Sequence, residues 1–188
     1  MKSQIQTNID NLKLLLSDHT LQGEIEKSIT EISKALSQGL PLLVFGNGGS
    51  ASDALHITGE LVGKFNADRK SLNVICLNSN VTVITAWAND FSFNTIYARQ
   101  IEAHGVKKGV CLGISTSGNS KSVVNGIKQA KKMGMVTIAL TGSSGGALKD
   151  CVDILINVPS NITPRIQEMH VPVYHYICEK IEHNLIGI

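Results

Sequence analysis

The stretch LLVFGNGGSASDALHITGEL, residues 42–61, decides the fold of this 188-residue chain. It begins with a continuous apolar run at 42–45, passes through a glycine-rich loop, and continues into a helical pattern over 51–65. A short continuous apolar run is typical of a strand in a parallel sheet that helices cover on both faces. The stretch therefore predicts a strand, a tight loop and a helix, in that order.

The same alternation continues to the end of the chain. Apolar runs and helical patterns follow one another at 72–77, 81–88, 93–104, 110–114, 122–133, 136–140, 154–158 and 162–186. Alternating strands and helices are typical of α/β proteins with a mainly parallel sheet between two helical layers. We therefore predict an α/β core over 41–188, a three-layer sandwich of the flavodoxin-like type, with no linker or internal repeat.

Two further helical patterns precede the first strand. Apolar residues recur at helical spacing at Ile5, Ile9, Leu12 and Leu16, and again at Ile25, Ile29, Ile32 and Leu36. Such stripes can cover the sheet of the same subunit or pack against another copy of the chain. We predict a helical pair over 1–40, favour an oligomer interface for it, and assign residues 1–188 to a single domain.

The composition narrows the classes of protein. Hydrophobic residues make up 43% and charged residues 17% of the chain, which excludes a disordered protein. The net charge is +2 and no basic run occurs, so charge gives no support to a nucleic-acid or membrane partner. We expect no signal peptide and no membrane span. The four cysteines are far apart, which favours a cytoplasmic protein without disulfides.

The first loop, GNGGS at 46–50, is suited to close contact with an anionic ligand. Glycines let backbone N–H groups approach a ligand, and the N-terminus of the following helix attracts negative charge. Gly46, Gly48 and Ala51 fit a dinucleotide-binding fingerprint, but the next strand ends in LNSN at 77–80, without the acidic residue that binds ribose. We therefore expect no nucleotide cofactor, and a purely structural turn remains an alternative.

A second loop, STSGNS at 115–120, follows the strand predicted at 110–114. Its hydroxyl and backbone N–H donors at a helix N-terminus suit a phosphate monoester, although Ser120 alone is also a plausible N-cap. Ligands of open α/β sheets bind at the carboxyl ends of the strands, where both loops belong. Polar donors without a ribose-binding acid favour a small phosphorylated polyol as the ligand.

Four side chains could carry proton chemistry beside these loops. His56 and Glu60 are four residues apart on one helix face, and Gln167 and His175 lie roughly on one side of the last helix. A carboxylate base with an imidazole suits aldose–ketose isomerisation through an enediol. A divalent metal could polarise the substrate oxygens instead, but Gln is an uncommon zinc ligand and the spacing alone predicts no metal.

Each of these residues also has a structural interpretation. His56 could be a buried histidine of the core, and Glu60 a surface carboxylate paired with a lysine. We expect Glu168 and His170 on a solvent or interface face. Pro172 lies inside the last helical pattern, where it removes a backbone donor and is expected to kink the helix between Gln167 and His175.

Several segments together resemble the sugar-isomerase (SIS) domain family, and more narrowly its sedoheptulose 7-phosphate isomerases, or phosphoheptose isomerases. The segments are GNGGSASDALHITGEL at 46–61, ANDFSFN at 88–94, GISTSGNS at 113–120, LTGSSGG at 140–146, and RIQEMH at 165–170 followed by His175. The resemblance covers essentially the whole chain. It implies conversion of sedoheptulose 7-phosphate to D-glycero-D-manno-heptose 7-phosphate, an early step in making the heptoses of bacterial surface glycans.

The resemblance also implies roles for individual residues. Glu60 matches the general base and His175 the general acid. The residues that match a zinc site, with one ion per subunit, are His56, Glu60, Gln167 and His175. The residues that match substrate contacts are Asn47, Gly48, Gly49, Glu60, Asn89, Asp90 and Gln167, with the phosphate pocket at Ser115, Thr116, Ser117 and Ser120. The family is homotetrameric, with active sites between subunits.

Two positions depart from some relatives, and other functions remain open. Pro164 stands where some relatives have an acidic residue, and Lys64 where some have Arg, which is not equivalent as a bidentate partner. A non-catalytic SIS tetramer that acts as an adaptor for a replication initiator would lack the counterparts of Glu60 and His175. A sugar-phosphate sensor and an isomerase of another sugar phosphate are further alternatives.

Overall fold

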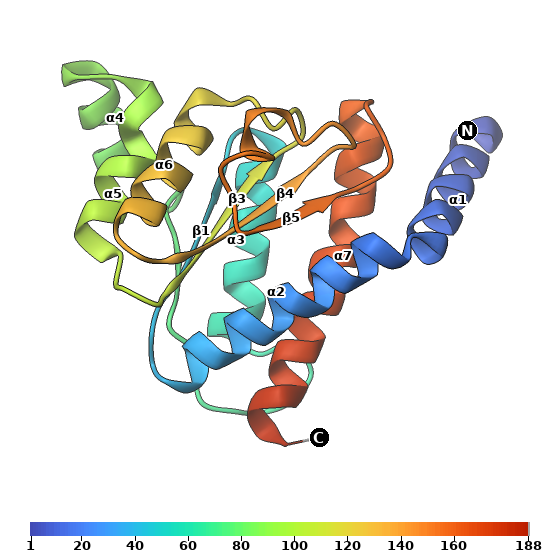
Figure 1. The fold of residues 1–188 in the computed structure, drawn as a ribbon, viewed down its shortest axis with the longest axis horizontal. Coiled ribbons are helices and arrows are strands. Elements are labelled where there is room, and N and C mark those ends of the chain that lie inside the picture. The colour runs from blue at the N-terminus through green and yellow to red at the C-terminus, as the bar shows by residue number, and fades with distance from the viewer. Residues whose placement is uncertain (188) are drawn as a thin grey trace.

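One parallel sheet organises the chain. The computed structural model describes residues 1–187, and its elements are α1 (Lys2–Ser17), α2 (His19–Ser37), β1 (Leu42–Gly46), α3 (Gly49–Val62), β2 (Val74–Cys76), α4 (Val81–Asp90), η1 (Phe93–Thr95), α5 (Ile96–His104), β3 (Val110–Ser115), α6 (Lys121–Lys132), β4 (Val136–Thr141), η2 (Gly146–Leu148), β5 (Ile154–Asn157) and α7 (Thr163–Ile186) (Figure 1). All strand pairs are parallel, in the order β2-β1-β3-β4-β5. This order is the flavodoxin-like one, and the predicted α/β sandwich is confirmed.

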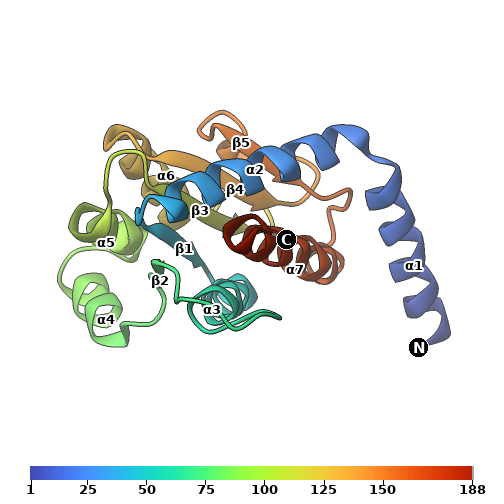
Figure 2. The same cartoon turned by 90° about the horizontal axis from the view of Figure 1, so that it is seen from below.

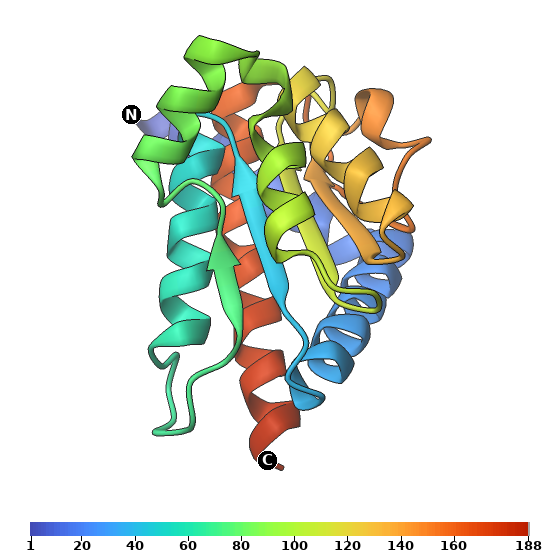
Figure 3. The same cartoon turned by 90° about the vertical axis from the view of Figure 1, so that its left-hand side faces the viewer.

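Helices cover both faces of the sheet because the strands are apolar throughout. In β1, Leu42 and Val44 pack in a core with α2, α3 and α7, whereas Leu43 and Phe45 pack in a second core with α5 and α6. Successive strand residues point to opposite faces, so a continuous apolar run serves both layers. Figure 3 shows α5 and α6 in front of the sheet, with α2 and α7 behind it.

The two N-terminal helices differ in what they bury. Residues of α2 such as Ile29 and Ile32 are buried against the sheet and α7 of the same chain. Helix α1 buries no residue, and its apolar Ile5, Ile9 and Leu12 stay exposed. It stands at the side of the α/β body beyond α7 (Figure 2). The apolar stripe of α2 is therefore covered within one chain, whereas that of α1 is not, and the oligomer interface over residues 1–40 stays a prediction.

A buried ion pair fixes the end of α3 relative to α7. The Glu182 carboxylate accepts hydrogen bonds from the backbone N–H groups of Phe65, Asn66 and Ala67 at 2.8–3.1 Å and from Arg69 Nε at 2.9 Å. The same guanidinium donates to the carbonyl oxygen of Glu60 at 3.0 Å. Because the pair is almost fully buried and hydrogen-bonded, it holds the last turn of α3 beside α7.

Candidate active site

Helices α3 and α7 bring a carboxylate and two imidazoles together. Nε2 of His56 lies 3.1 Å from Oε1 of Glu60 and 3.4 Å from Nε2 of His175. The ligand atoms of these three residues all lie within 4.8 Å of one another. The i, i+4 spacing on α3 places the first two on one face, and α7 supplies the third from the far end of the chain. The cluster can exchange protons or hold a cation.

The structural interpretations of His56 and Glu60 do not hold. The His56 side chain is 45% exposed, so it is not a core histidine. Glu60 pairs with His56, and no lysine pairs with it within residues 1–187. Both groups are therefore accessible to a ligand that approaches the cluster from solvent.

Two residues behind the cluster were missed by sequence reasoning. The Tyr174 hydroxyl lies 3.0 Å from Nδ1 of His56. Burial, and to a smaller extent the nearby carboxyl group of Asp53, raises the pKa of Tyr174 to about 12. Asp53 is itself buried, which raises its pKa to about 6 although His56 opposes the shift. Its Oδ2 has no hydrogen-bond partner within residues 1–187. Asp53 lies one helical turn before His56, and this spacing is the one feature of the sequence that could have identified Asp53.

Gln167 reaches the first residue of α3. A Cβ atom on Gly49 would clash with Nε2 of Gln167, so the Gln167 amide lies directly against the backbone of Gly49 in space that a side chain would occupy. Gln167 contacts α3 at Gly49 and His175 contacts it at His56, in agreement with the prediction that both lie on one side of α7. The amide therefore borders the glycine loop, while the imidazole completes the cluster.

Loop one is held by side chains that the sequence did not single out. Asn78 accepts from the N–H of Gly46 at 3.2 Å and donates to its carbonyl oxygen at 2.8 Å. The Tyr97 hydroxyl lies 2.8 Å from Oδ1 of Asn47, whose Nδ2 donates to Ser122 at 2.9 Å. Asn78 thus lies just after β2, at the position where a dinucleotide-binding site has the acidic residue that binds ribose. Here the side chain at this position binds the loop backbone instead.

In loop two, the Ser120 hydroxyl does not cap the helix that follows it. Ser120 is the N-cap residue of α6, yet its side chain makes no capping hydrogen bond and instead lies 3.2 Å from the Ser115 hydroxyl. Gly118 has a φ of 66°, and a Cβ there would clash with the backbone of Gly145. The loop is therefore shaped by its glycine, and the hydroxyl of Ser120 is available to a ligand.

Asn89 and Asp90 lie at the end of α4, outside the cluster. Within residues 1–187 the side chains of these two residues hydrogen-bond to each other, at 2.8 Å, and both are exposed. Helix α4 buries no residue, and Phe91 beside them is 69% exposed. The structure does not join this pair to His56, Glu60 and His175 in one chain.

The structure also places three further residues of α7, namely His170, Glu168 and Pro172. His170 is fully buried and donates from Nε2 to the Thr141 carbonyl oxygen at 3.2 Å, so its expected solvent or interface position is wrong. The reason is that its face of α7 packs on the sheet. Glu168 pairs with Arg165 at 2.7 Å. Helix α7 runs on through Pro172 from Thr163 to Ile186.

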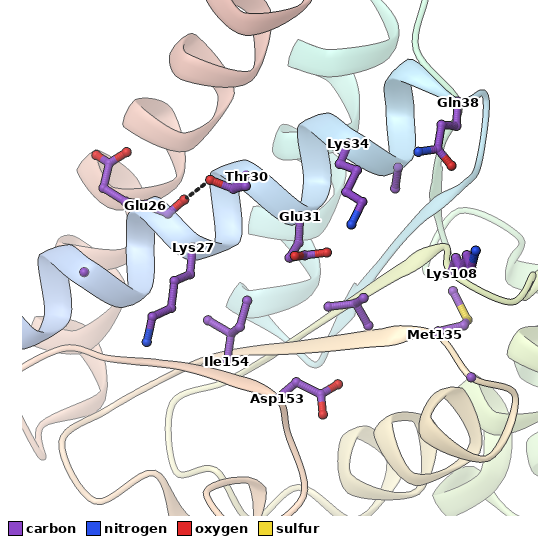
Figure 4. Close-up of a pocket in the computed structure, with 14 residues that line it drawn as sticks. Glu26, Lys27, Thr30, Glu31, Lys34, Gln38, Lys108, Met135, Asp153 and Ile154 are labelled. Atoms are coloured by element: carbon purple, nitrogen blue, oxygen red, sulfur yellow. Dashed lines mark hydrogen bonds between the residues drawn. The ribbon is translucent and has the colours of Figure 1, made fainter.

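A cavity of about 760 Å³ lies between α2 and the amino ends of β4 and β5 (Figure 4). Its charged lining residues are Glu26, Lys27, Glu31, Lys34, Lys108 and Asp153. None of the residues predicted for the active site lines it, and its acidic and basic side chains balance. The cavity is therefore separate from the cluster of His56, Glu60 and His175. Among residues 1–187, no helix combines the length and apolar character needed to cross a membrane.

Comparison with known proteins gives a consistent result. The sequence model of the SIS domain matches residues 9–142. A probable phosphoheptose isomerase of Thermoplasma acidophilum is 52% identical over 165 residues, which cover 86% of this chain and 91% of the relative. The phosphoheptose isomerase of Helicobacter pylori is 45% identical, with 86% and 84% covered.

Solved structures give the same picture. The phosphoheptose isomerase of Neisseria gonorrhoeae superposes with a TM-score of 0.89 at 32% identity, covering 96% of each chain. That of Francisella tularensis superposes with a TM-score of 0.90 at 34% identity, covering 96% of this chain and 95% of the other. The similarity includes the N-terminal helices, since so little of either chain lies outside it.

Proposed function

The chain belongs to the SIS domain family, and from this premise we propose that it is a phosphoheptose isomerase, which interconverts sedoheptulose 7-phosphate and D-glycero-D-manno-heptose 7-phosphate in heptose biosynthesis. The observation that carries the proposal is the meeting of Glu60 and His175, from α3 and α7, in one cluster with His56. An adaptor of the SIS type would have no use for this pair of groups, so the enzyme is favoured.

The isomerisation moves one proton between carbons and one between oxygens. In our proposal the Glu60 carboxylate takes a proton from C1 of the ketose and returns it to C2 of the enediol. His175 gives a proton to the carbonyl oxygen on C2 and takes back the hydroxyl proton of O1. No atom is gained or lost, so the residues return to their starting protonation states.

The phosphate group is assigned to loop two. Hydroxyls of Ser115, Thr116, Ser117 and Ser120 at the N-terminus of α6 supply neutral donors, and the helix dipole favours the dianion. Loop one, with Asn47, Gly48 and Gly49, is assigned to the sugar, together with Asn89, Asp90 and Gln167. Because loops one and two follow the adjacent strands β1 and β3, one extended ligand can span both.

The cluster fits a divalent metal, and we propose zinc. Two imidazole nitrogens only 3.4 Å apart, with a carboxylate oxygen beside them, form a donor set that zinc prefers. His56, Glu60 and His175 would hold the ion, with Gln167 as the fourth ligand. When bound, the ion would polarise the substrate oxygens. The second oxygen of Glu60 stays available to the substrate carbon.

We further propose a cytoplasmic homotetramer, with residues 1–188 as one SIS domain and active sites completed by neighbouring subunits. Three observations support the shared sites: the exposed apolar face of α1, the 45% exposure of His56, and the exposed end of α4 that carries Asn89 and Asp90. A neighbouring copy would cover these surfaces. Free, widely separated cysteines support a reducing compartment.

Direct turnover tests the proposed function. Purified protein, with and without added Zn²⁺, is incubated with sedoheptulose 7-phosphate, and the anomeric region of the proton NMR spectrum is followed. We expect aldoheptose 7-phosphate signals, and much slower reaction with fructose 6-phosphate and ribulose 5-phosphate. Absence of product despite binding of the heptulose phosphate would favour a sensor, and faster turnover of a shorter ketose phosphate would assign another substrate.

The phosphate assignment predicts the effect of Ser120→Ala. The variant removes a donor to a charged group, a loss worth about 1.5–3 kcal/mol, and KM should rise by about 10- to 100-fold with kcat little changed. The free energy of unfolding should fall by about 1 kcal/mol at most, because the side chain makes no capping bond and loses one hydrogen bond, that with Ser115. Steady-state kinetics measure the first effect and urea unfolding the second. An unaltered KM would remove Ser120 from the phosphate pocket.

A further inference from the structure

We propose that Tyr174 is a positioning residue for His56, and that its hydroxyl holds the imidazole so that Nε2 faces Glu60 and His175. The inference rests on the proposed function, because it assigns to Tyr174 a role in the site described above. No motif in the sequence marks this residue, and its part in the site follows from contacts made across two helices.

The geometry fixes the imidazole from both sides. Nδ1 of His56 lies 3.0 Å from the Tyr174 hydroxyl, while Nε2 lies 3.1 Å from Oε1 of Glu60. Turning the ring over would replace both nitrogens by carbons and lose both contacts. The Tyr174 ring also packs edge-on against His56, with centroids 5.4 Å apart and planes at 70°. The hydroxyl thus selects one ring orientation.

Neighbouring residues of α7 act on opposite nitrogens of the same ring. Tyr174 contacts Nδ1, and His175, the next residue, lies 3.4 Å from Nε2. Tyr174 is only 2% exposed and is packed in the core, so its hydroxyl is held on a rigid support. The position of the His56 ring relative to His175 is therefore set by one turn of one helix.

A hydroxyl suits this position because it can donate and accept. When Nε2 carries a proton towards Glu60, the tyrosine donates to Nδ1. When Nε2 must present its lone pair to a cation, Nδ1–H donates to the hydroxyl oxygen. The same contact therefore serves both tautomers, and it adds no charge beside Glu60. Outer partners of this kind typically change metal affinity or activity by about 10- to 100-fold when they are removed.

The test compares Tyr174→Phe with Tyr176→Phe. Tyr176 lies two residues along the same helix and donates its hydroxyl to Glu26 at 2.8 Å, away from the cluster, so it is a matched control for loss of one phenolic hydroxyl. Affinity for Zn²⁺ is measured by competition with a chromophoric chelator. We expect Tyr174→Phe to weaken binding at least tenfold and Tyr176→Phe to change it less than twofold. Equal affinities in all three proteins would overturn the inference.

A second readout separates this inference from the proposed metal site. The ring nitrogens of His56 are followed by ¹⁵N NMR in the metal-free proteins. A shift of its Nδ1 signal in Tyr174→Phe, but not in Tyr176→Phe, supports the positioning role even if the wild-type protein binds no zinc, a result that would refute the zinc proposal alone. An unchanged Nδ1 signal would overturn the inference. Tyr174→Met, which also lacks the hydroxyl, replaces the Phe variant if that variant does not fold.

Discussion

His56 and His170 are two histidines of the site region that have different roles. His56 is 45% exposed and its two ring nitrogens face Glu60 and Tyr174. His170 is fully buried, and burial lowers its pKa to about 4 even though the hydrogen bond to Thr141 opposes the shift. The first is therefore placed for chemistry, and the second is a neutral part of the core beneath it.

The buried His170 predicts a loss of stability in mild acid. Its folded-state pKa of about 4 lies below the ordinary 6.5, so the unfolded chain binds the proton more tightly. Stability from this group is complete above pH 6.5 and is lost as the pH falls towards 4. Between pH 7 and 4.5 the wild type should lose about 2 kcal/mol more than His170→Gln, measured by urea unfolding at both pH values. Equal losses in the two proteins would refute this assignment.

The sequence alone identified some residues of the candidate site and missed others, for a physical reason. His56 and Glu60 were found because their spacing of four residues on one helix is visible in the sequence. Tyr174 acts on a residue 118 positions away, and Tyr97 on one 50 positions away. Such partners are set by packing, and a tyrosine within an amphipathic helix is otherwise indistinguishable from a core residue.

At the scale of elements, the Gln167 side chain of α7 packs against Gly49 at the start of α3. Gly49→Ala should displace the Gln167 amide and lower kcat/KM about tenfold or more, because a 1 Å misplacement in a site can cost about 100-fold. The control is Gly59→Ala in the same helix, where a Cβ meets nothing within 4 Å. It should raise the free energy of unfolding by about 1 kcal/mol and leave kcat/KM unchanged. Steady-state kinetics give kcat/KM of both variants, and urea unfolding gives their free energies of unfolding. Full activity of Gly49→Ala would contradict the account.

The elements themselves followed the apolar patterns closely. The run at 110–114 became Val110–Ser115 and that at 136–140 became Val136–Thr141. The pattern over 93–104 divides into η1 and α5, since Ser92 caps a short turn before the α-helix begins. The sequence alone did not decide what the second N-terminal helix packs against. An apolar stripe can cover the sheet of its own chain or pack against another copy of the chain.

At the scale of the whole molecule, α1 leaves an apolar face that one chain does not cover. Ile5, Ile9 and Leu12 are each 41–50% exposed, and one described link from α1 to the body is the 3.1 Å hydrogen bond from Arg165 to Asn8. Exposed apolar faces of this kind are typical of interfaces between protein chains. The face supports the proposed tetramer, in which helices from several copies would pack together.

The tetramer is tested by sedimentation equilibrium of the wild type and Ile9→Glu. The wild type should have four times the chain mass of 20.2 kDa, and the variant should shift to smaller species. The variant chain should keep its fold, because α1 buries no residue in one chain. A wild-type monomer would refute the tetramer, and an unchanged tetramer in the variant would place its interface elsewhere.

The central claim is that Glu60 and His175 act on one bound ketose phosphate, and hydrogen exchange at C1 measures it most directly. Sedoheptulose 7-phosphate is incubated in D₂O with wild type, Glu60→Gln or His175→Gln, and loss of the C1 proton signal is followed by NMR. We predict deuterium exchange into C1 with the wild type, because the proton that Glu60 takes from C1 can exchange with solvent while the enediol is bound. The rate should be lower by about 10²- to 10⁴-fold with Glu60→Gln, which keeps the shape but loses the base. Exchange at the wild-type rate in Glu60→Gln would contradict the account.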